Sequence, residues 1–297
     1  MDTANFDAFL AVAETGSFSR AAERLYLTQP AVSKRIATLE LQLSARLFDR
    51  VGKTVRLTEA GHALRPRAEL ILNALNDTQR ALGNLSTTIK GRLSLATSHH
   101  IGLHRLPPIL RRFTKAYPGV VLDIEFLDSE VAYDKVLHGE IELAIITLAP
   151  KVEPPLIATR IWNDALAFVV APEHPLADLQ QVSMQQLAGF PAVFPGAHTF
   201  THRVVSRLFE EFGIVPQVSM STNYMETIKM LVSIGLAWSV LPRTMIDTQV
   251  RALDVPGTSL MRELGCIHHS GRTLSNAARA LISLLHSVAE NPEKPSN

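Results

Sequence analysis

The sequence has 297 residues, a length at which two or three compact units are expected rather than one ordinary domain. Hydrophobic residues make up 46% and charged residues 19%, which is typical of globular proteins and excludes wholesale disorder. The net charge of +1 indicates nothing about nucleic acid, but residues 17–56 carry eight Lys/Arg against three Asp/Glu. The rest of the chain carries more acidic than basic side chains, and a basic segment beside a mildly acidic remainder is the electrostatic pattern expected of a DNA-binding module.

The first residues show no basic segment followed by a continuous apolar stretch, and no run is long enough to cross a bilayer. We therefore expect no signal peptide, no transmembrane helix and no membrane partner. The single cysteine, Cys266, fits a reducing compartment, so the expected location is the cytoplasm. Its apolar strand context favours a buried, inert thiol over a redox sensor.

Three helices are predicted at the N-terminal end. Residues 4–15 show apolar side chains at helical spacing before a stop at Gly16, and a short second helix is expected over 19–25. After a turn at Tyr26 and Leu27, Thr28 is placed to cap a third helix. One apolar stripe of that helix should pack on the first two: Val32, Ile36, Leu39 and Leu43.

The outward side of the third helix is the predicted DNA-reading surface, and a hairpin over 50–56 with Gly52 at its tip follows it. The first half of the helix should enter the major groove, while hairpin cations contact the DNA backbone. Gln29, Ser33 and Lys34 are assigned to base edges, and Arg35 or Thr38 to phosphates. The alternative is a solvated basic face. The full set of candidates is Gln29, Pro30, Ser33, Lys34, Arg35, Thr38, Arg50, Lys53 and Arg56.

A long helix is predicted from Thr58 to about Thr88. Apolar residues recur in it every seven positions along two seams, which is typical of helix pairing between chains. One seam holds Ala68, Leu75, Leu82 and Ile89, and the other holds Leu64, Ile71, Thr78 and Leu85. The candidate dimerisation residues are Leu64, Ile71, Leu75, Leu82 and Leu85. Pro66 should kink this helix.

From Gly91 onward, strands and helices alternate. Strands are expected over 92–97, 120–126 and 143–147, with helices over 106–117 and 131–138 between them. A second similar unit follows Phe168, and a helix over 276–288 capped by Ser275 closes the chain. This order predicts a mostly parallel sheet with helices on both faces.

The chain resembles the LysR-type transcriptional regulators over essentially its whole length. The strongest part is the stretch from Phe9 to Gly61, where six elements fall in family order: Gly-Ser-Phe, Ala-Ala-x-x-Leu, Gln-Pro-Ala-Val-Ser, Leu-Glu, Leu-Phe-x-Arg and Leu-Thr-x-x-Gly. Weaker similarity lies in "LPPILRRFTKAYPGVVLDI" and "IKMLVSIGLAWSVLPR". Departures include Ser44 where Gly is common, Glu142 where Asp is common, and Ala237-Trp238 for a smaller pair.

This resemblance implies an α/β multidomain protein with a winged helix-turn-helix, a linker helix and a two-lobed, periplasmic-binding-protein-like effector domain. The expected boundaries are 1–58, 59–89 and 90–297, with lobe I over about 90–162 and 267–297 and lobe II over about 163–266. It also implies homodimers or homotetramers on an imperfect palindromic operator, a small-molecule effector, and RNA polymerase as a candidate partner. The effector, the target genes and the direction of regulation stay open.

The effector is expected in the cleft outside the carboxyl ends of the strands, where hydroxyl and amide groups suit a carboxylate or oxyanion. Ser98 and Thr199 are the main candidates, and ordinary strand-end capping is the alternative for the rest. The full set is Thr97, Ser98, His99, His100, Thr147, Gly196, His198, Thr199 and Thr201.

No metal or cofactor is expected. His99, His100 and His104 lie close in sequence, but no carboxylate accompanies them, and His99 and His100 should point apart on a strand or turn. The sequence lacks a Walker loop, a dinucleotide-binding glycine motif and a Gly-x-Ser-x-Gly elbow, so no enzyme is predicted. The alternative function is a solute-binding protein without DNA-binding regulation.

Overall fold

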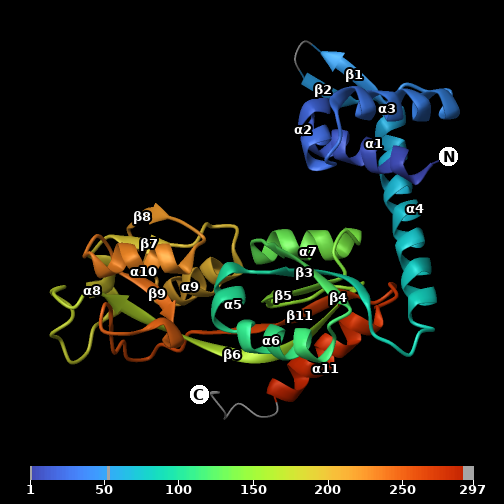
Figure 1. Cartoon of the computed structure of the whole chain (residues 1–297). Coiled ribbons are helices and arrows are strands. Elements are labelled where there is room, and N and C mark those ends of the chain that lie inside the picture. The colour runs from blue at the N-terminus through green and yellow to red at the C-terminus, as the bar shows by residue number, and fades with distance from the viewer. Residues whose placement is uncertain (1, 52–53, 290–297) are drawn as a thin grey trace. The chain divides into compact units, whose positions relative to one another are not determined.

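The computed structural model describes residues 2–51 and 54–289, and the chain divides into two compact units at residues 85/86 (Figure 1). Among the described residues, no helix combines the length and apolar character needed to cross a membrane. The N-terminal unit comprises α1 (Thr3–Thr15), α2 (Phe18–Arg24), α3 (Gln29–Leu43), β1 (Phe48–Val51), β2 (Thr54–Leu57) and α4 (Glu59–Gly83). These elements confirm the predicted three helices, hairpin and long helix.

Helix ends in this unit follow local sequence signals. Gly16 ends α1 in the left-handed region at φ 61°, and Ser17 caps α2 by accepting from the Arg20 amide. Thr28 occupies the N-cap position of α3, but its side chain makes no capping hydrogen bond. Ser44, where the related sequences often have Gly, adopts φ 51° at the C-cap. The turn therefore forms without glycine, at some conformational cost.

Polar residues fix the hairpin to the helices around it. A carboxylate oxygen of Glu40 accepts from the Leu47 amide at 2.7 Å, and the Thr58 hydroxyl caps the Gly61 amide at 3.0 Å while donating to the Arg46 carbonyl. A Cβ at Gly61 would lie 2.3 Å from the Leu47 carbonyl oxygen. Only glycine permits that approach, which explains the Leu-Thr-x-x-Gly spacing physically.

The burial of the two seams changes along α4. Ala68 is buried and Leu64 half-buried in the core of the N-terminal unit, so the assignment of Leu64 to pairing between chains is corrected. Further along, Ile71, Leu75 and Leu82 are exposed. The helix continues through Pro66 and ends at Gly83, before the predicted end.

The last two positions of the seams lie outside the helix. Leu85 is exposed in the turns that follow Gly83, and Ile89 packs against the core of the second unit. The prediction that Leu85 belongs to a helical seam is therefore wrong. The unpartnered apolar surface of α4 is confined to its second half.

The second unit contains the remaining elements. They are β3 (Gly91–Thr97), α5 (His99–His104), α6 (Pro107–Ala116), β4 (Val120–Phe126), α7 (Ser129–His138), β5 (Leu143–Thr147), β6 (Leu156–Val170), α8 (Met184–Ala188), β7 (Ala192–Phe194), α9 (Phe200–Glu211), β8 (Val218–Ser221), α10 (Met225–Ser233), β9 (Ser239–Pro242), η1 (Arg243–Met245), β10 (Arg251–Ala252), β11 (Met261–His269) and α11 (Asn276–Ala289). The sequence reading missed α5, α8 and the long strand β6.

The principal sheet is mixed rather than mostly parallel. Its strand order is β10-β6-β11-β5-β3-β4, with β9 also paired to β6. Strands β3, β4 and β5 are parallel, as predicted, but β11 runs antiparallel to both β5 and β6. The reason is that β6 and β11 are the two strands along which the chain passes between the two lobes.

Each lobe packs helices on both faces of its strands. In the first lobe, Leu95 of β3 contributes to the core beneath α6 and α11, and the next residue, Ala96, to the core beneath α7. In the second lobe, Phe168 of β6 belongs to the core with α8 and α9, and Val169 to the core with α10. The proposed lobe boundaries, 162/163 and 266/267, fall within the two shared strands.

The C-terminal helix α11 begins as predicted, because the Ser275 hydroxyl accepts from the Ala278 amide at 3.1 Å. The buried carboxylate of Glu142 accepts from the Ser275 amide at 2.6 Å. Glu142, a departure from the usual Asp, therefore connects the start of β5 to the start of α11.

The exposed half of α4 yields a test of chain pairing. We expect Leu82→Asp to shift the purified protein toward monomer, because the new charge opposes burial of the apolar seam. Sedimentation velocity measures the change. Asn76→Asp adds the same charge at an exposed position off the seam and is the control. Equal assembly of both variants and wild type would contradict pairing through this seam.

Cys266 gives a second test. Burial raises the pKa of Cys266 to about 11, so the side chain is a neutral thiol at physiological pH. We expect native protein at pH 8 to resist a thiol-reactive dye for hours and denatured protein to take up one equivalent within minutes. Rapid labelling of native protein would show that Cys266 is accessible.

Candidate DNA interface and pocket between the lobes

The first half of α3 presents polar side chains on its outer side. Gln29, Pro30 and Lys34 are exposed, and Ser33 is half-buried beside them. The Gln29 amide nitrogen donates to the Ser33 hydroxyl at 3.0 Å. This hydrogen bond orients the amide and leaves its carbonyl oxygen free to accept from a base edge. Thr38 hydrogen-bonds the Lys34 carbonyl within the helix at 2.8 Å.

Arg35 does not share that outer side. It is half-buried, and its guanidinium reaches the Ala4 carbonyl at 3.5 Å near the start of α1. Burial raises the pKa of Asp7, and the positive charge of Arg35 acts against this rise. The assignment of Arg35 to phosphate contact is therefore corrected: it joins α3 to α1.

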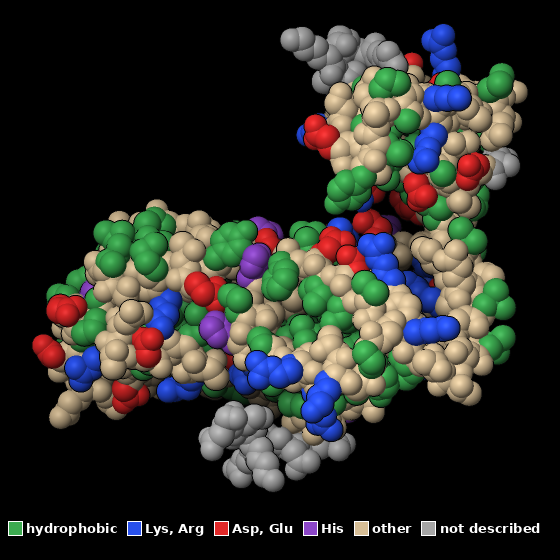
Figure 2. Space-filling model, viewed as in Figure 1, with side chains coloured by type: hydrophobic (Ala, Val, Ile, Leu, Met, Phe, Trp, Pro, Cys, Tyr) green, Lys and Arg blue, Asp and Glu red, His purple; other side chains and the backbone are tan. Residues whose placement is uncertain are grey.

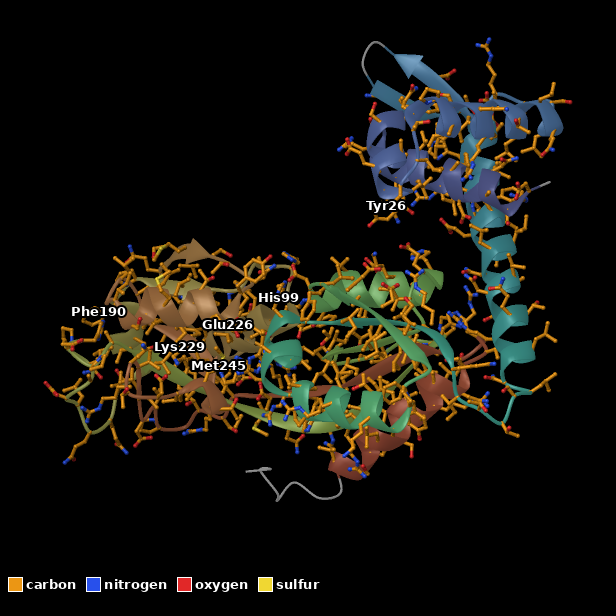
Figure 3. The ribbon with its side chains drawn as sticks, viewed as in Figure 1. Tyr26, His99, Phe190, Glu226, Lys229 and Met245 are labelled. Atoms are coloured by element: carbon orange, nitrogen blue, oxygen red, sulfur yellow. The ribbon has the colours of Figure 1, made fainter. Side chains whose placement is uncertain are left out.

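The hairpin is described only in part. Arg56 on β2 is exposed and lies opposite Asp49 on β1. Lys53 and Gly52 lie outside the described residues, and the side chain of Arg50 is not among those described. Tyr26, at φ 54° in the turn before α3, exposes 96% of its surface, and the sequence reading assigned it no role (Figure 3).

A pocket of about 50 Å³ lies between the lobes of the second unit. Both lobes contribute, through the ends of β3 and β5 and through the segments around α9 and α10. Six of the nine predicted effector residues line it: Ser98, His99, His100, Thr147, Thr199 and Thr201. The pocket thus brings together most of the set chosen from sequence.

Three predicted effector residues lie elsewhere or are otherwise engaged. Thr97 is fully buried, and its hydroxyl donates to the Ile145 carbonyl at 2.8 Å inside the sheet, so its assignment to the effector is wrong. Gly196 donates its amide to the Asn223 side chain and does not line the pocket. His198 is exposed, with its ring 3.8 Å from the Asp128 carboxylate.

Hydroxyl groups in the pocket differ in their availability. The Thr199 hydroxyl caps α9, accepting from the His202 amide and donating to the Gly196 carbonyl. Ser98 stands at the N-cap position of α5; its backbone carbonyl accepts from the Gly102 amide, but its hydroxyl makes no capping bond and has no hydrogen-bond partner among the described residues. Ser98 is therefore the more available donor.

A buried ion pair reaches the pocket through Arg262, which lines it. Arg262 of β11 lies directly opposite Asp164 of β6, with Nε 2.8 Å from a carboxylate oxygen. Its Nη1 donates to the Thr201 hydroxyl at 2.9 Å, and Arg105 approaches the other carboxylate oxygen at 3.2 Å. The second terminal nitrogen of Arg262, Nη2, is buried without a hydrogen-bond partner among the described residues. The sequence reading missed this arginine, because cross-strand pairing brings it here.

Two acidic side chains of the first lobe accept hydrogen bonds from nitrogen atoms of the second lobe. Glu130 on α7 accepts from the Phe200 amide at the start of α9. Asp128 accepts from the Asn223 side-chain nitrogen at 2.6 Å. Both carboxylates line the pocket and occupy groups that a bound anion could use.

The histidines are arranged differently from the expectation. His99 and His100 lie on a helix rather than a strand or turn, and His104 follows His100 by one helical turn. His104 Nε2 is 2.9 Å from a carboxylate oxygen of Glu226 on α10. Burial, with the charge of Arg262 acting in the same direction, lowers the pKa of His100 to about 3. Both premises of the no-metal expectation, the backbone geometry and the missing carboxylate, are therefore corrected.

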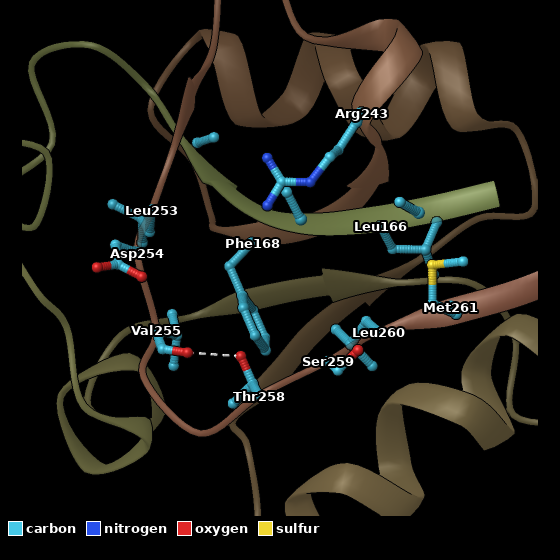
Figure 4. A pocket seen from close by; sticks show the side chains of 13 residues that line it. Leu166, Phe168, Arg243, Leu253, Asp254, Val255, Thr258, Ser259, Leu260 and Met261 are labelled. Atoms are coloured by element: carbon cyan, nitrogen blue, oxygen red, sulfur yellow. Dashed lines mark hydrogen bonds between the residues drawn. The ribbon is translucent and has the colours of Figure 1, made fainter.

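A larger cavity of about 380 Å³ lies elsewhere in the second unit (Figure 4). Leu166, Phe168, Arg243 and Asp254 contribute to its lining, and Thr258 donates to the Val255 carbonyl at its edge. None of the predicted effector residues lines it. Only the smaller pocket, of these two, brings together the sequence candidates and the unpartnered buried nitrogen of Arg262.

Comparisons with known proteins cover both units. The family model "Bacterial regulatory helix-turn-helix protein, lysR family" matches residues 4–62, and "LysR substrate binding domain" matches residues 86–290. An uncharacterised HTH-type transcriptional regulator of Azotobacter vinelandii is 72% identical over 108 residues, which cover 36% of this chain and 75% of the relative. A probable RuBisCO transcriptional regulator of Cyanidioschyzon merolae is 31% identical over 280 residues, which cover 91% of this chain and 92% of the relative.

Solved structures share the fold at low identity. Full-length CbnR complexed with its target DNA superposes with a TM-score of 0.65 at 21% identity, covering 97% of this chain and 100% of that one. The effector-binding domain of QuiR in complex with shikimate superposes with a TM-score of 0.62 at 20% identity, covering 68% of this chain and 98% of that one. The two matched units span both halves of the molecule described above. The chain therefore belongs to the LysR family of DNA-binding transcriptional regulators, with an N-terminal helix-turn-helix and a two-lobed effector-binding domain.

Proposed function

We propose that this regulator responds to a small carboxylate-bearing effector that binds between the lobes and pairs with Arg262. The carrying observation is the buried Arg262 Nη2, which has no partner among the described residues while the rest of the guanidinium is engaged. Leaving a charged donor unpaired in a buried site is costly, so an acceptor there gains a strong charge-assisted hydrogen bond. The available Ser98 hydroxyl supplies a second donor.

The size and charge of the pocket constrain the effector further. About 50 Å³ is far below the roughly 300–1,000 Å³ of pockets that enclose drug-sized ligands. Asp128 and Glu130 also repel an anion. Binding therefore requires these carboxylates to release Asn223 and the Phe200 amide, which separates contacts between the lobes.

This exchange supplies a mechanism for regulation. The effector replaces acids of the first lobe as the partner of donors in the second, so it favours a different lobe arrangement from the free protein. A ligand that discriminates between two states shifts their populations, and DNA binding changes with them. The complex of QuiR with shikimate, a hydroxylated carboxylate, supports this ligand class by analogy of fold.

We infer that α3 reads bases and the hairpin contacts the DNA backbone. Gln29, Ser33 and Lys34 are the proposed base contacts, and Arg56, with Arg50 and Lys53 of the hairpin, the proposed phosphate contacts. The DNA complex of CbnR supports the use of this fold on duplex DNA. Pairing through α4 would place two such helices on a palindromic operator.

We propose that the protein acts in the cytoplasm, where the chromosome is accessible, and that it regulates transcription rather than catalysing a reaction. The helix-turn-helix match argues against a solute-binding protein without DNA binding. RNA polymerase is the natural partner of a regulator bound near a promoter.

The DNA proposal predicts two distinct losses. We expect Gln29→Ala to weaken binding to the operator by roughly 1–3 kcal/mol more than binding to scrambled DNA, because a direct contact with a base edge is lost. We expect Arg56→Ala to weaken both alike and to reduce the salt dependence. Gel-shift titrations with the region upstream of the gene measure both. Gln42→Ala, exposed on the second half of α3, is the control. Equal losses on both DNAs for Gln29→Ala would contradict base reading.

The effector proposal predicts opposite effects of two pocket substitutions. A thermal-shift panel of small hydroxycarboxylates, with shikimate as the first probe, should give a rise in Tm that Ser98→Ala reduces and Glu130→Gln increases. Ser98→Ala removes a donor but leaves the buried ion pair intact, whereas Glu130→Gln removes a competing charge.

Arg207→Gln is the matched control, because this exposed arginine on α9 pairs only with Glu211 among the described residues. We expect it to respond like wild type. If the ligand raised the Tm of Ser98→Ala as much as that of the wild type, and raised the Tm of Arg207→Gln less, the carboxylate would bind outside the proposed pocket.

A further inference from the structure

Three side chains from two lobes meet beside the pocket. The first lobe contributes His100 and His104 from α5, and the second contributes Glu226 from α10. One ligand atom from each lies within 4.8 Å of the other two. Figure 2 shows His side chains (purple) on the face of the second unit where α5 approaches α10, and Figure 3 shows Glu226 beside α5.

The donor set matches that of known transition-metal sites. Two histidines one helical turn apart project from the same side of a helix, and a single carboxylate completes a His₂Glu set that binds Zn²⁺ with a fourth position open. Tetrahedral coordination at about 2.0–2.1 Å separates ligand atoms by roughly 3.3 Å. His104 and Glu226 are already 2.9 Å apart, so rotation of His100 supplies most of the adjustment.

His100 provides an independent indication of a ligand. Only 4% of its surface is exposed, and neither ring nitrogen has a hydrogen-bond partner among the described residues. A buried imidazole with both nitrogens unpartnered is unfavourable, and coordination of an ion by one nitrogen relieves that cost.

The surrounding charge favours a cation of charge +2. Arg105 and Arg262 are the basic groups around His100, and both are paired with the Asp164 carboxylate. Three further carboxylates are close by: Asp128 and Glu130 line the pocket that His100 shares, and Glu226 faces His104. Two arginines against four carboxylates leave an excess of two negative charges, which a divalent ion neutralises.

We propose that His100, His104 and Glu226 bind a divalent transition-metal ion of the Zn²⁺ type, which joins the two lobes beside the effector pocket. The ion connects α5 to α10, so it stabilises the lobe arrangement in which these helices are close. Its binding is therefore linked to the lobe movement that the effector controls. The site itself is built from side chains that the proposed effector contacts do not require.

The test is a titration of metal-free, full-length protein with Zn²⁺ in the absence of DNA and effector. Isothermal titration calorimetry should show one saturable site per chain, and Co²⁺ should give the visible absorption of a tetrahedral complex. His104→Gln and Glu226→Gln should each lower the Zn²⁺ affinity by more than about tenfold. Loss of a residue that only hydrogen-bonds a metal ligand already lowers metal affinity by about tenfold or more, and loss of the ligand itself should cost more. His104 and Glu226 are 40% and 38% exposed, so neither replacement removes a core side chain.

His99→Gln is the matched control, since His99 lies on the same helix but its ring packs against those of Phe126 (tilted) and Tyr224 (edge-on) instead of joining the site. The His99→Gln variant should bind Zn²⁺ like the wild type, and Zn²⁺ should raise the Tm of the variant and of the wild type. Absence of a saturable site, or an equal loss in His99→Gln and His104→Gln, would overturn the proposal. A protein that still shows operator binding and the carboxylate shift would then retain its proposed function without a metal site.

Discussion

The buried pair of Asp164 and Arg262 is the interaction on which the effector domain depends. The two residues face each other on β6 and β11, the strands that both lobes share. Removing one partner of such a pair typically costs about 3–5 kcal/mol, because the other charge stays buried and unpaired. The pair also extends outward: Arg105 joins it from the first lobe and Thr201 from the second. One carboxylate therefore organises groups from both sides of the cleft.

In the proposed function, this arrangement couples effector binding to movement of the lobes. The guanidinium that orders the crossing strands is also the one that offers an unpaired nitrogen to the pocket. Acids of the first lobe already occupy donors of the second, so the free protein holds itself in one arrangement through contacts that resemble those of an anionic ligand. In the proposed mechanism, effector oxygen atoms replace the carboxylate oxygens of Asp128 and Glu130 as acceptors in the cleft.

Sequence periodicity and capping signals were sufficient for the helix-turn-helix, the long helix and most βα units, because each of these depends on local spacing. They were insufficient wherever a role depends on pairing across the fold. Strand β6 has polar residues such as Asn163 and Asp164 in its middle, which hid its length. Helix α5 is too short to show a period. Glu226 and Arg262 reach their sites from distant positions in the chain, and the apolar seam of α4 gave no sign that Leu64 belongs to an internal core.

The division of α4 into a buried first half and an exposed second half has a mechanical consequence. Ala68 is fully buried, and Gly61 lies against the Leu47 carbonyl, so the early turns of α4 pack into one core with α1 and α3. The exposed turns belong to the same continuous helix, Glu59–Gly83, so a rotation of these turns is passed to the N-terminal core that holds α3. Under the proposed pairing through α4, rotation of one α4 relative to the other turns the two α3 helices relative to each other on the duplex.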